Sequence, residues 1–357
     1  MVSSTQSGSE GRERLKRSCS VDLSFPYHRY EQSHEGEAHA TVSLPIDCTR
    51  DLETNLSELF EFESALWFPS GTMAQLVAAR IFMQATEGSR AALHPTSHLL
   101  LHEAEAYRHI LGLEAVEMGS WNRTVLASDL PDSAAFAFLE LPQRHNGGAL
   151  PTWDELQAIK RATSGVGKPL HIDGARIWGC RPFYDNRTYA EIVHGCSSLY
   201  VSLYKDLGAS SGAALMGSRE FIDQACIWRV RHGGALVNSE PQAADALRGL
   251  RYHLPQMERY VEVAHQLAQA IVAQNGCVTS PHPPHVNMFR VPLPFGVDQA
   301  RSRRDAIAAS HKVWLSDNFW QAPNSTNCEL EITVGEIASQ TDPDVIANAI
   351  SALIGIR

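Results

Sequence analysis

Two charged side chains stand at the ends of strongly apolar segments. Asp173 closes the segment PLHID, and Lys205 directly follows SLYVSLY. Ligands bind at the carboxyl ends of the strands in an α/β sheet, so both side chains are expected to face one bound molecule. A lysine amine forms a Schiff base with an aldehyde, and a buried carboxylate keeps a pyridine nitrogen protonated. Pyridoxal 5′-phosphate (PLP) needs this combination. An ion pair at a sheet edge is the structural alternative.

A third segment suits a phosphate group. PSGTMA, residues 69–74, precedes an apolar-periodic run at 73–83 that predicts a helix. Free amides and the helix dipole favour an anion at such a start, and the hydroxyls of Ser70 and Thr72 flank the amides around Gly71. An ordinary Ser or Thr helix cap is the alternative.

In this order, SGTMAQ, HIDGAR and a Lys ahead of LGAS resemble the threonine aldolase and β-eliminating lyase family of fold-type I PLP enzymes, over roughly residues 50 to 250. The resemblance implies PLP as cofactor and an α/β, aspartate-aminotransferase-like large domain with a mostly parallel sheet. It also implies roles for the matching residues. The phosphate would be bound by Ser70, Gly71 and Thr72 of the SGT segment, and the ring nitrogen by Asp173. The substrate carboxylate would be bound by Arg176, and the aldehyde would be attached to Lys205.

The family also stacks a His on the cofactor ring, five residues before a Glu, and His98 and Glu103 have this spacing. The resemblance implies that His98 stacks on the ring and transfers protons, for which an imidazole is suited by its pKa. We expect Glu103 to contribute to the substrate site. His98 also forms an i, i+4, i+8 series with His94 and His102, which could indicate a metal site. Pro95 and the lack of a cysteine or carboxylate cluster disfavour this interpretation, so no metal is expected.

Several positions depart from the family pattern and bear on the substrate. Glu140-Leu-Pro-Gln-Arg144 replaces a Glu-Asn-Thr-His-like turn, so Gln143 is expected to reach the phenolic oxygen of PLP and Arg144 to bind the substrate carboxylate, unless Arg144 is a solvated surface residue. Tyr204 replaces the Ser before the lysine, which leaves Ser202 as the expected phosphate-binding hydroxyl.

Two carboxylate contacts of the family are replaced. SVDLSFPYHRY, residues 20–30, stands in place of a Ser-Asp pair, and Glu329 and Glu331 stand where an Arg is common. A carboxylate would be repelled by these glutamates. Arg229 and Arg231 match the position from which the family supplies a basic residue to the cofactor phosphate of a neighbouring subunit. The resemblance therefore implies a homodimer or homotetramer with shared active sites. The alternative is that the helix dipole alone favours basic residues at this helix end.

Composition limits the class of protein. The 357 residues are 44% hydrophobic and 20% charged, enough for a large domain and a smaller one. A formal net charge of −10 disfavours nucleic acid and anionic membranes as partners. Seven scattered cysteines without a CxxC pair predict free thiols in a reducing compartment, and we expect a cytoplasmic protein.

The chain is expected to form three parts: a disordered tail at 1–20, a PLP-binding large domain at 21–270, and a small α+β C-terminal domain at 271–357. The N-terminal segment of the large domain is expected to contribute to the small domain or to the edge of the active site. Alternation and apolar runs predict strands at 135–141, 169–173, 198–204, 212–216, 287–291 and 328–334. Helices are predicted at 152–162, with a capping box, across 242–274 as one or two helices, and at 342–353.

The expected activity is that of an aldehyde-lyase on a small amino acid, which splits a β-hydroxy-α-amino acid such as threonine or allo-threonine into glycine and an aldehyde by retro-aldol cleavage. Elimination of a β-substituent and racemisation remain open, because PLP supplies the shared chemistry and the pocket selects the outcome. A non-catalytic scaffold is disfavoured because the Lys and Asp are both present. A nucleotide-binding oxidoreductase is disfavoured because no GxGxxG occurs.

Overall fold

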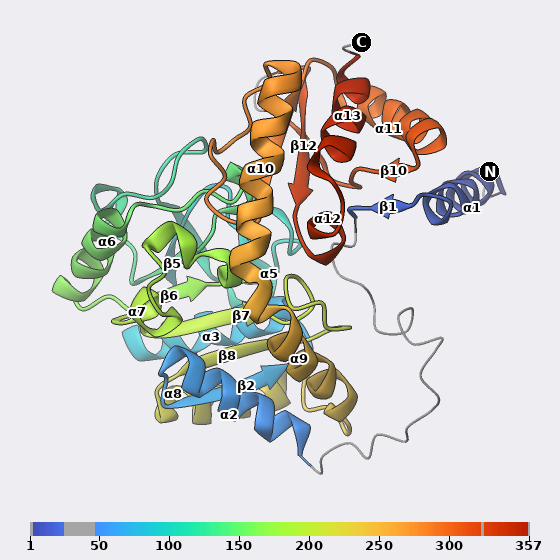
Figure 1. Ribbon diagram of the computed structural model, residues 1–357. Coiled ribbons are helices and arrows are strands. Elements are labelled where there is room, and N and C mark those ends of the chain that lie inside the picture. Colours follow the sequence, from blue (N-terminus) through green and yellow to red (C-terminus); the bar gives the residue numbers. More distant parts are fainter. Residues whose placement is uncertain (1–2, 25–46, 323–324, 356–357) are drawn as a thin grey trace. The chain divides into compact units, whose positions relative to one another are not determined.

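The computed structural model describes residues 3–24, 47–322 and 325–355. The chain forms two compact units (Figure 1), the larger spanning Arg29–Gln256 and the smaller combining Met1–His28 with Met257–Arg357. The expected division near residue 270 falls inside α10 (Met257–Asn275), a continuous helix of 19 residues. Because α10 packs along α13 (Pro343–Ile354), the whole helix belongs to the smaller unit.

A seven-stranded sheet forms the centre of the larger unit, with strand order β2-β8-β7-β6-β5-β3-β4. β8 is antiparallel to both its neighbours, and the other neighbouring pairs are parallel. The four predicted strands of this unit are confirmed as β5, β6, β7 and β8. The strands are β2 (Ser64–Phe68), β3 (Arg90–Leu93), β4 (Glu114–Glu117), β5 (Phe136–Glu140), β6 (Leu170–Asp173), β7 (Ser198–Ser202) and β8 (Ala213–Gly217).

Helices of the larger unit begin where the sequence supplies a cap. α3 (Gly71–Thr86) starts after Ser70, whose side chain accepts the backbone N–H of Met73. α6 (Trp153–Gly165) starts with the predicted capping box of Thr152 and Glu155. The remaining helices are α2 (Cys48–Phe60), α4 (His98–Leu101), α5 (Ala106–Leu111), α7 (Tyr189–Val193), α8 (Arg219–Arg231) and α9 (Glu240–Tyr252).

One core cluster of the larger unit lies between the sheet and the pair α3 and α8. Apolar residues of α3 pack on β7 and β8 and against α8. Phe82 and Phe136 contribute to this core, with ring centroids 5.7 Å apart. Because α3 packs tightly in this core, its N-terminus has a fixed position beside the sheet.

The smaller unit is α+β, as predicted. Its antiparallel sheet has the order β11-β12-β9, formed by Phe319–Gln321, Cys328–Thr333 and Met288–Leu293. The predicted strands near 287–291 and 328–334 are β9 and β12, and the predicted last helix is α13. The unit also contains α11 (Val297–His311), α12 (Glu336–Ser339) and a parallel pair of short strands, β1 (Val21–Asp22) and β10 (Val313–Trp314).

The N-terminal segment differs from the expected disordered tail. Ser3–Arg17 forms helix α1, which packs on α11. Lys16 Nζ lies 2.7 Å from Asp317 Oδ2, and Arg12 Nε lies 3.4 Å from Asp305 Oδ2. Basic residues that a composition argument assigns to a solvated tail thus have acidic partners 293 and 301 positions later in the chain, which no local pattern reveals.

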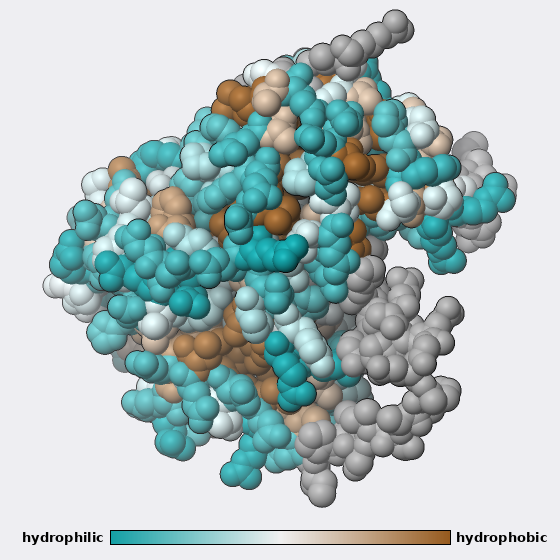
Figure 2. All heavy atoms as spheres, in the orientation of Figure 1, coloured by the Kyte–Doolittle hydropathy of each residue, from teal (hydrophilic) through white to brown (hydrophobic). Residues whose placement is uncertain are grey.

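Hydrophilic residues cover much of the face seen in Figure 2, with apolar side chains in several groups between them.

Within the described part of the chain, we find no helix of the length and apolar character required to cross a bilayer.

Candidate active site

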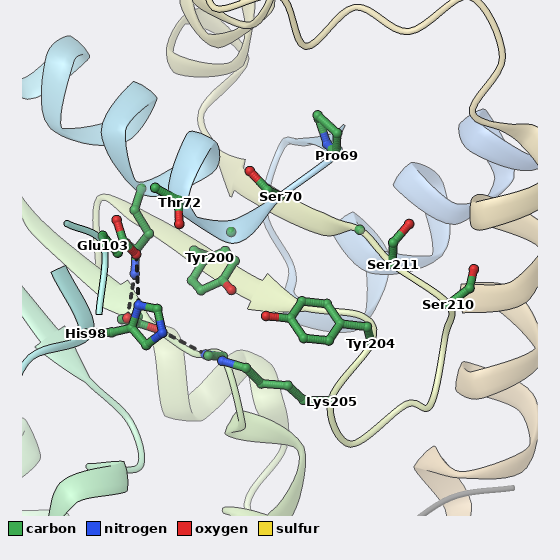
Figure 3. Close-up of a pocket in the computed structure, with 15 residues that line it drawn as sticks. Pro69, Ser70, Thr72, His98, Glu103, Tyr200, Tyr204, Lys205, Ser210 and Ser211 are labelled. Atoms are coloured by element: carbon green, nitrogen blue, oxygen red, sulfur yellow. Dashed lines mark hydrogen bonds and ion pairs between the residues drawn. The ribbon is translucent and has the colours of Figure 1, made fainter. Parts of the chain in front are cut away.

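A cavity of about 330 Å³ opens in the larger unit at the carboxyl ends of β6 and β7 and the N-terminus of α3. Its wall contains seven of the predicted site residues: Ser70, Gly71, Thr72, His98, Glu103, Asp173 and Lys205. Figure 3 shows His98 and Lys205 facing one side of the cavity and Ser70 and Thr72 facing the other. Residues from segments more than 130 positions apart therefore line one site.

The N-terminus of α3 forms a narrow cradle. A Cβ at Gly71 would lie 2.1 Å from Tyr200 Oη, so only glycine leaves room for the tyrosine ring. Tyr200 lies on β7 and is almost fully buried, and its hydroxyl lies beside Gly71 in the first turn of α3. Hydroxyls of Ser70 and Thr72 complete a small polar surface at the positive end of the helix dipole, which suits a phosphate group.

Asp173 ends β6 and is almost completely buried, with 4% of its surface exposed. Its Oδ2 accepts a hydrogen bond of 2.5 Å from Gln75 Nε2, and its Oδ1 accepts the N–H of Ala175 at 3.1 Å. Burial raises the pKa of this carboxyl, while the charges of Lys205 and His98 and the Ala175 bond lower it. A cationic ring nitrogen is the partner that would compensate the buried charge.

Lys205 lies three residues beyond β7 and lines the same cavity as Asp173. Burial lowers the pKa of its amine to about 8, and the Arg176 charge adds to this effect while Asp173 opposes it. A lowered pKa increases the fraction of free amine near neutral pH, and the free amine is the form that attacks an aldehyde.

His98 begins α4 and is oriented by Glu103. Its Nδ1 donates to Glu103 Oε1 over 2.9 Å, as the dashed line in Figure 3 marks. Glu103 has 7% of its surface exposed, so a buried carboxylate fixes the orientation of the imidazole. The ring therefore presents Nε2 as its second nitrogen, in the same cavity as Lys205.

Arg176 does not line the cavity. Its Nη1 lies 3.2 Å from Asp206 Oδ1, and the Asp206 side chain is fully buried. The residue that follows the lysine is therefore a buried ionic partner of this guanidinium.

Gln143 and Arg144 also lie outside the cavity wall. Gln143 is 1% exposed and its Oε1 accepts a bond from Asn146; its Nε2 has no hydrogen-bond partner among the described residues. Arg144 is half-buried, and its backbone N–H is bound by Glu140 Oε1 at 2.9 Å.

The remaining predicted cofactor contacts are also outside the cavity. Ser202 is fully buried on β7. Arg229 donates from Nη1 to the carbonyl oxygen of Trp67 over 2.7 Å. Arg231 is exposed and its guanidinium lies over the Trp228 ring, 4.5 Å from the centroid.

The two glutamates of the C-terminal strand have partners within the smaller unit. Glu331 is 2% exposed and accepts bonds from Asn318 Nδ2 at 3.2 Å and Trp320 Nε1 at 3.0 Å. Glu329 pairs with Arg290 at 2.9 Å. Both carboxylates are therefore occupied within the smaller unit. Of the segment 20–30, residues 25–30 lie outside the described part of the chain.

Eight lining residues were not predicted to belong to the site: Pro69, Gln75, Ala175, Tyr200, Tyr204, Ser210, Ser211 and Gly212. Gln75 lies one helical turn after Gly71, so its place on the cavity side of α3 follows from the predicted helix and the helical period. Tyr200 and Tyr204 point into the cavity between Ser70 and Lys205 (Figure 3). No local signal distinguishes these tyrosines from ordinary core aromatics.

A histidine pair adjoins His98. His102 Nε2 lies 2.8 Å from His145 Nε2, and the planes of the two rings are nearly parallel, at an interplanar angle of 9°. The rings of His98 and His102 have centroids 5.1 Å apart. Across the described ranges, no cluster of three or more His, Cys, Asp or Glu side chains could hold a metal ion.

The donor set fits PLP. The cavity offers an amine with a lowered pKa for the aldehyde, a buried carboxylate for the ring nitrogen, an imidazole for the ring face, and a helix N-terminus with a glycine cradle for the phosphate. The aldehyde, the ring nitrogen and the phosphate of the cofactor thus each have a matching group in one cavity.

Comparison with known proteins agrees with this fit. The model of the family described as "Beta-eliminating lyase" matches residues 46–292. A "Low specificity L-threonine aldolase" of Escherichia coli (strain K12) is 29% identical over 230 residues, covering 62% of this chain and 68% of that protein. "Low-specificity L-threonine aldolase 1" of Arabidopsis thaliana is 27% identical over 242 residues, covering 64% of this chain and 66% of that protein.

Solved structures are similar over nearly the whole chain. One described as a "putative L-allo-threonine aldolase" from Listeria monocytogenes EGD-E has a TM-score of 0.85 and 29% identity, covering 97% of this chain and 99% of that chain. A serine palmitoyltransferase of Sphingomonas wittichii has a TM-score of 0.68 at 15% identity over 96% of this chain and 81% of that chain, a similarity of fold alone.

Proposed function

Since this chain belongs to the β-eliminating lyase family and is a PLP-dependent lyase, we propose that it cleaves a β-hydroxy-α-amino acid of the threonine or allo-threonine type into glycine and an aldehyde. The observation that carries the proposal is the position of His98. An imidazole fixed by a buried carboxylate shares the cavity with Lys205 and Asp173. A carbon–carbon cleavage that starts from a β-hydroxyl needs such a base.

When bound, PLP supplies an electron sink for the carbanion that cleavage leaves at Cα. The proposed role of Lys205 is to attach the aldehyde, for which its lowered pKa keeps a usable fraction of free amine. Asp173 is proposed to hold the proton on the ring nitrogen, and Ser70 and Thr72 to bind the phosphate with the first amides of α3.

His98 is proposed to take the β-hydroxyl proton at Nε2. The Glu103 carboxylate fixes the proton of the ring on Nδ1, which leaves Nε2 with its lone pair facing the cavity. The same carboxylate stabilises the imidazolium that forms when the proton arrives. Glu103 thus acts on the substrate through His98, which refines its prediction as a substrate-binding residue.

Arg176 remains the proposed ligand of the substrate carboxylate, with Arg144 as second candidate. A guanidinium has five N–H donors in a fixed fork, and the contact with Asp206 is made by Nη1. We propose that Asp206 orients the fork, so that other donors of Arg176 turn to the substrate when it binds.

A homodimer or homotetramer with shared active sites is part of the proposal. Exposed aliphatic side chains gather at the end of α8 and in the loop after it: Ile227, Val230, Leu236 and Val237 are 45%, 62%, 47% and 108% exposed. The loop adjoins the cofactor cradle, because a Cβ at Gly234 would lie 2.3 Å from Met73 Sδ on α3. A second subunit would bury this surface. The free state of all seven cysteines supports a reducing, cytoplasmic setting.

The test is the visible absorption spectrum of the purified protein with PLP. We expect a cofactor band that Lys205→Arg abolishes, because arginine keeps the positive charge but cannot bond to the aldehyde. L-threonine and L-allo-threonine are then added separately, and we expect released acetaldehyde from at least one, with glycine as the second product.

The outcomes separate cofactor from reaction. A Lys205-dependent band without acetaldehyde would refute the aldolase proposal and favour elimination or racemisation, which L-serine and a chiral amino-acid assay detect. The absence of a band that depends on Lys205 would refute its role as attachment residue.

A further inference from the structure

A buried chain of hydrogen bonds ends on Asp173. Ser198 Oγ lies 2.7 Å from His171 Nδ1, and His171 Nε2 lies 2.9 Å from Gln75 Oε1. Gln75 Nε2 then donates to Asp173 Oδ2 over 2.5 Å. Three elements supply its members: β7 gives Ser198, β6 gives His171 and Asp173, and α3 gives Gln75.

The chemistry of each group fixes the direction of these bonds. A carboxylate only accepts, so Gln75 must turn its NH₂ to Asp173 and its carbonyl oxygen to His171. A carbonyl oxygen also only accepts, so His171 must carry its proton on Nε2. Its Nδ1 is then a lone pair and accepts the hydroxyl proton of Ser198. Every donor in this series of hydrogen bonds therefore points toward the Asp173 carboxylate.

Burial keeps this arrangement in a single charge state. His171 has no exposed surface, and its ring packs 4.5 Å from Phe138 and 6.4 Å from Phe82, centroid to centroid. Loss of hydration lowers the pKa of His171 to about 3, so the imidazole is neutral near neutral pH. Gln75 is 1% exposed and makes both of its contacts inside the protein.

We infer that Ser198, His171 and Gln75 form a positioning relay that keeps Asp173 ionised and correctly oriented for the ring nitrogen. The inference rests on the proposed role of Asp173 as the partner of that nitrogen. Burial by itself favours a neutral carboxyl, which could not hold the ring proton as an anion. Donors that all point inward offset this tendency, and aligned hydrogen bonds in a protein interior strengthen one another.

The opposite polarity would have an opposite consequence. With the His171 proton on Nδ1, the ring would donate to Ser198 and accept from the Gln75 amide. The Gln75 carbonyl oxygen would then face Asp173, which requires a protonated carboxyl. A proton on Nδ1 of His171 would therefore reveal a protonated Asp173 without any measurement of activity.

The first experiment is ¹⁵N NMR of the protein labelled on histidine, with the His171 signals assigned by a His171→Gln variant. We expect the proton on Nε2 and a lone pair on Nδ1 in the apoprotein and in the PLP-bound protein near neutral pH. A proton on Nδ1 in either form overturns the relay. Because the apoprotein is measured too, this result is independent of whether PLP binds as proposed.

The second experiment compares two identical substitutions on α3. Gln75→Met keeps the length of the side chain and removes both polar groups, whereas Gln84→Met makes the same change at an exposed residue. We expect Gln75→Met to raise the PLP dissociation constant roughly ten- to a hundredfold, the effect of losing a hydrogen bond to a buried charge, and to shift the pH profile of the cofactor band. Gln84→Met should leave both unchanged.

An unchanged dissociation constant and pH profile in Gln75→Met would overturn the inference. Should Gln75→Met fail to fold, Ser198→Ala provides the same test, because Ser198 is at the opposite end of the hydrogen-bond series from Asp173. It should move the ¹⁵N shift of His171 Nδ1 and weaken PLP binding less than Gln75→Met does. If wild-type protein binds no PLP, the proposed function fails, and the tautomer alone decides whether the relay exists.

Discussion

Replacing Gly71 with alanine should force a collision in the cofactor cradle. An ideal Cβ at this position lies 2.1 Å from Tyr200 Oη and 2.7 Å from Tyr200 Cζ, well inside the 3.0 Å that Cβ contacts essentially always exceed. The ring is rigid and 4% exposed, so it cannot swing away as a flexible side chain would. Overpacking of this kind costs about 1 to 3 kcal/mol, even after the better helix propensity of alanine. We expect that loss in the free energy of unfolding.

Urea unfolding of the apoprotein measures this effect, and PLP titration measures its consequence for the site. The matched control is Gly165→Ala, also within a terminal turn of a helix, because a Cβ there meets nothing within 4 Å. Gly165→Ala should be neutral or stabilising by up to about 1 kcal/mol. Adding Tyr200→Phe to Gly71→Ala removes the nearest atom and should restore part of the loss. Equal stability of Gly71→Ala and Gly165→Ala would refute the reasoning.

Three further substitutions probe charge and assembly. Burial and the Asp173 charge raise the pKa of Glu140 to about 7, from 4.5, so its contribution to stability is complete below pH 4.5 and is lost as the pH rises to 7. Glu140→Gln should therefore gain stability relative to wild type over that range, by at most about 1.4 kcal/mol per pH unit in urea unfolding of the apoprotein; a pH-independent difference contradicts this. Asp206→Asn leaves the Arg176 guanidinium without its buried carboxylate and should lower the free energy of unfolding by about 3 kcal/mol; a loss below about 1 kcal/mol would mean that the pair is effectively solvated. Leu236→Asp should lower the mass measured by analytical ultracentrifugation, whereas Val166→Asp, at a residue 60% exposed on another helix end, should not; a monomeric wild type rejects the interface.

The strands that position the site could be predicted from the sequence because the necessary signals are local. Continuous apolar runs identify β6 and β7, and the charge at the end of each run identifies Asp173 and Lys205. Ser70 before an apolar-periodic run identifies the start of α3. Each inference uses fewer than about twenty neighbouring residues, so it did not depend on the tertiary structure.

Interactions between distant segments could not be predicted in this way. The capture of Arg176 by Asp206 depends on the meeting of two loops, and no spacing along the chain encodes it. The sequence predicts the end of the larger unit near 270, because the helical pattern of 242–274 gives way to a strand pattern at 287–291. The boundary lies instead before Met257, because α10 packs along α13 of the smaller unit. Docking of α1 depends likewise on acidic partners in the last third of the chain.

Helix α3 connects the two ends of the proposed cofactor site. Its first turn forms the phosphate cradle at Gly71, and one turn later Gln75 donates to Asp173, the proposed partner of the ring nitrogen. One rigid helix, wedged into the core, would therefore position the cofactor at its phosphate and at its ring. Bond cleavage at Cα requires the breaking bond to stand perpendicular to the ring plane, so a small tilt of the ring is costly. Fixing both ends on one element limits that tilt more strictly than two independent loops would.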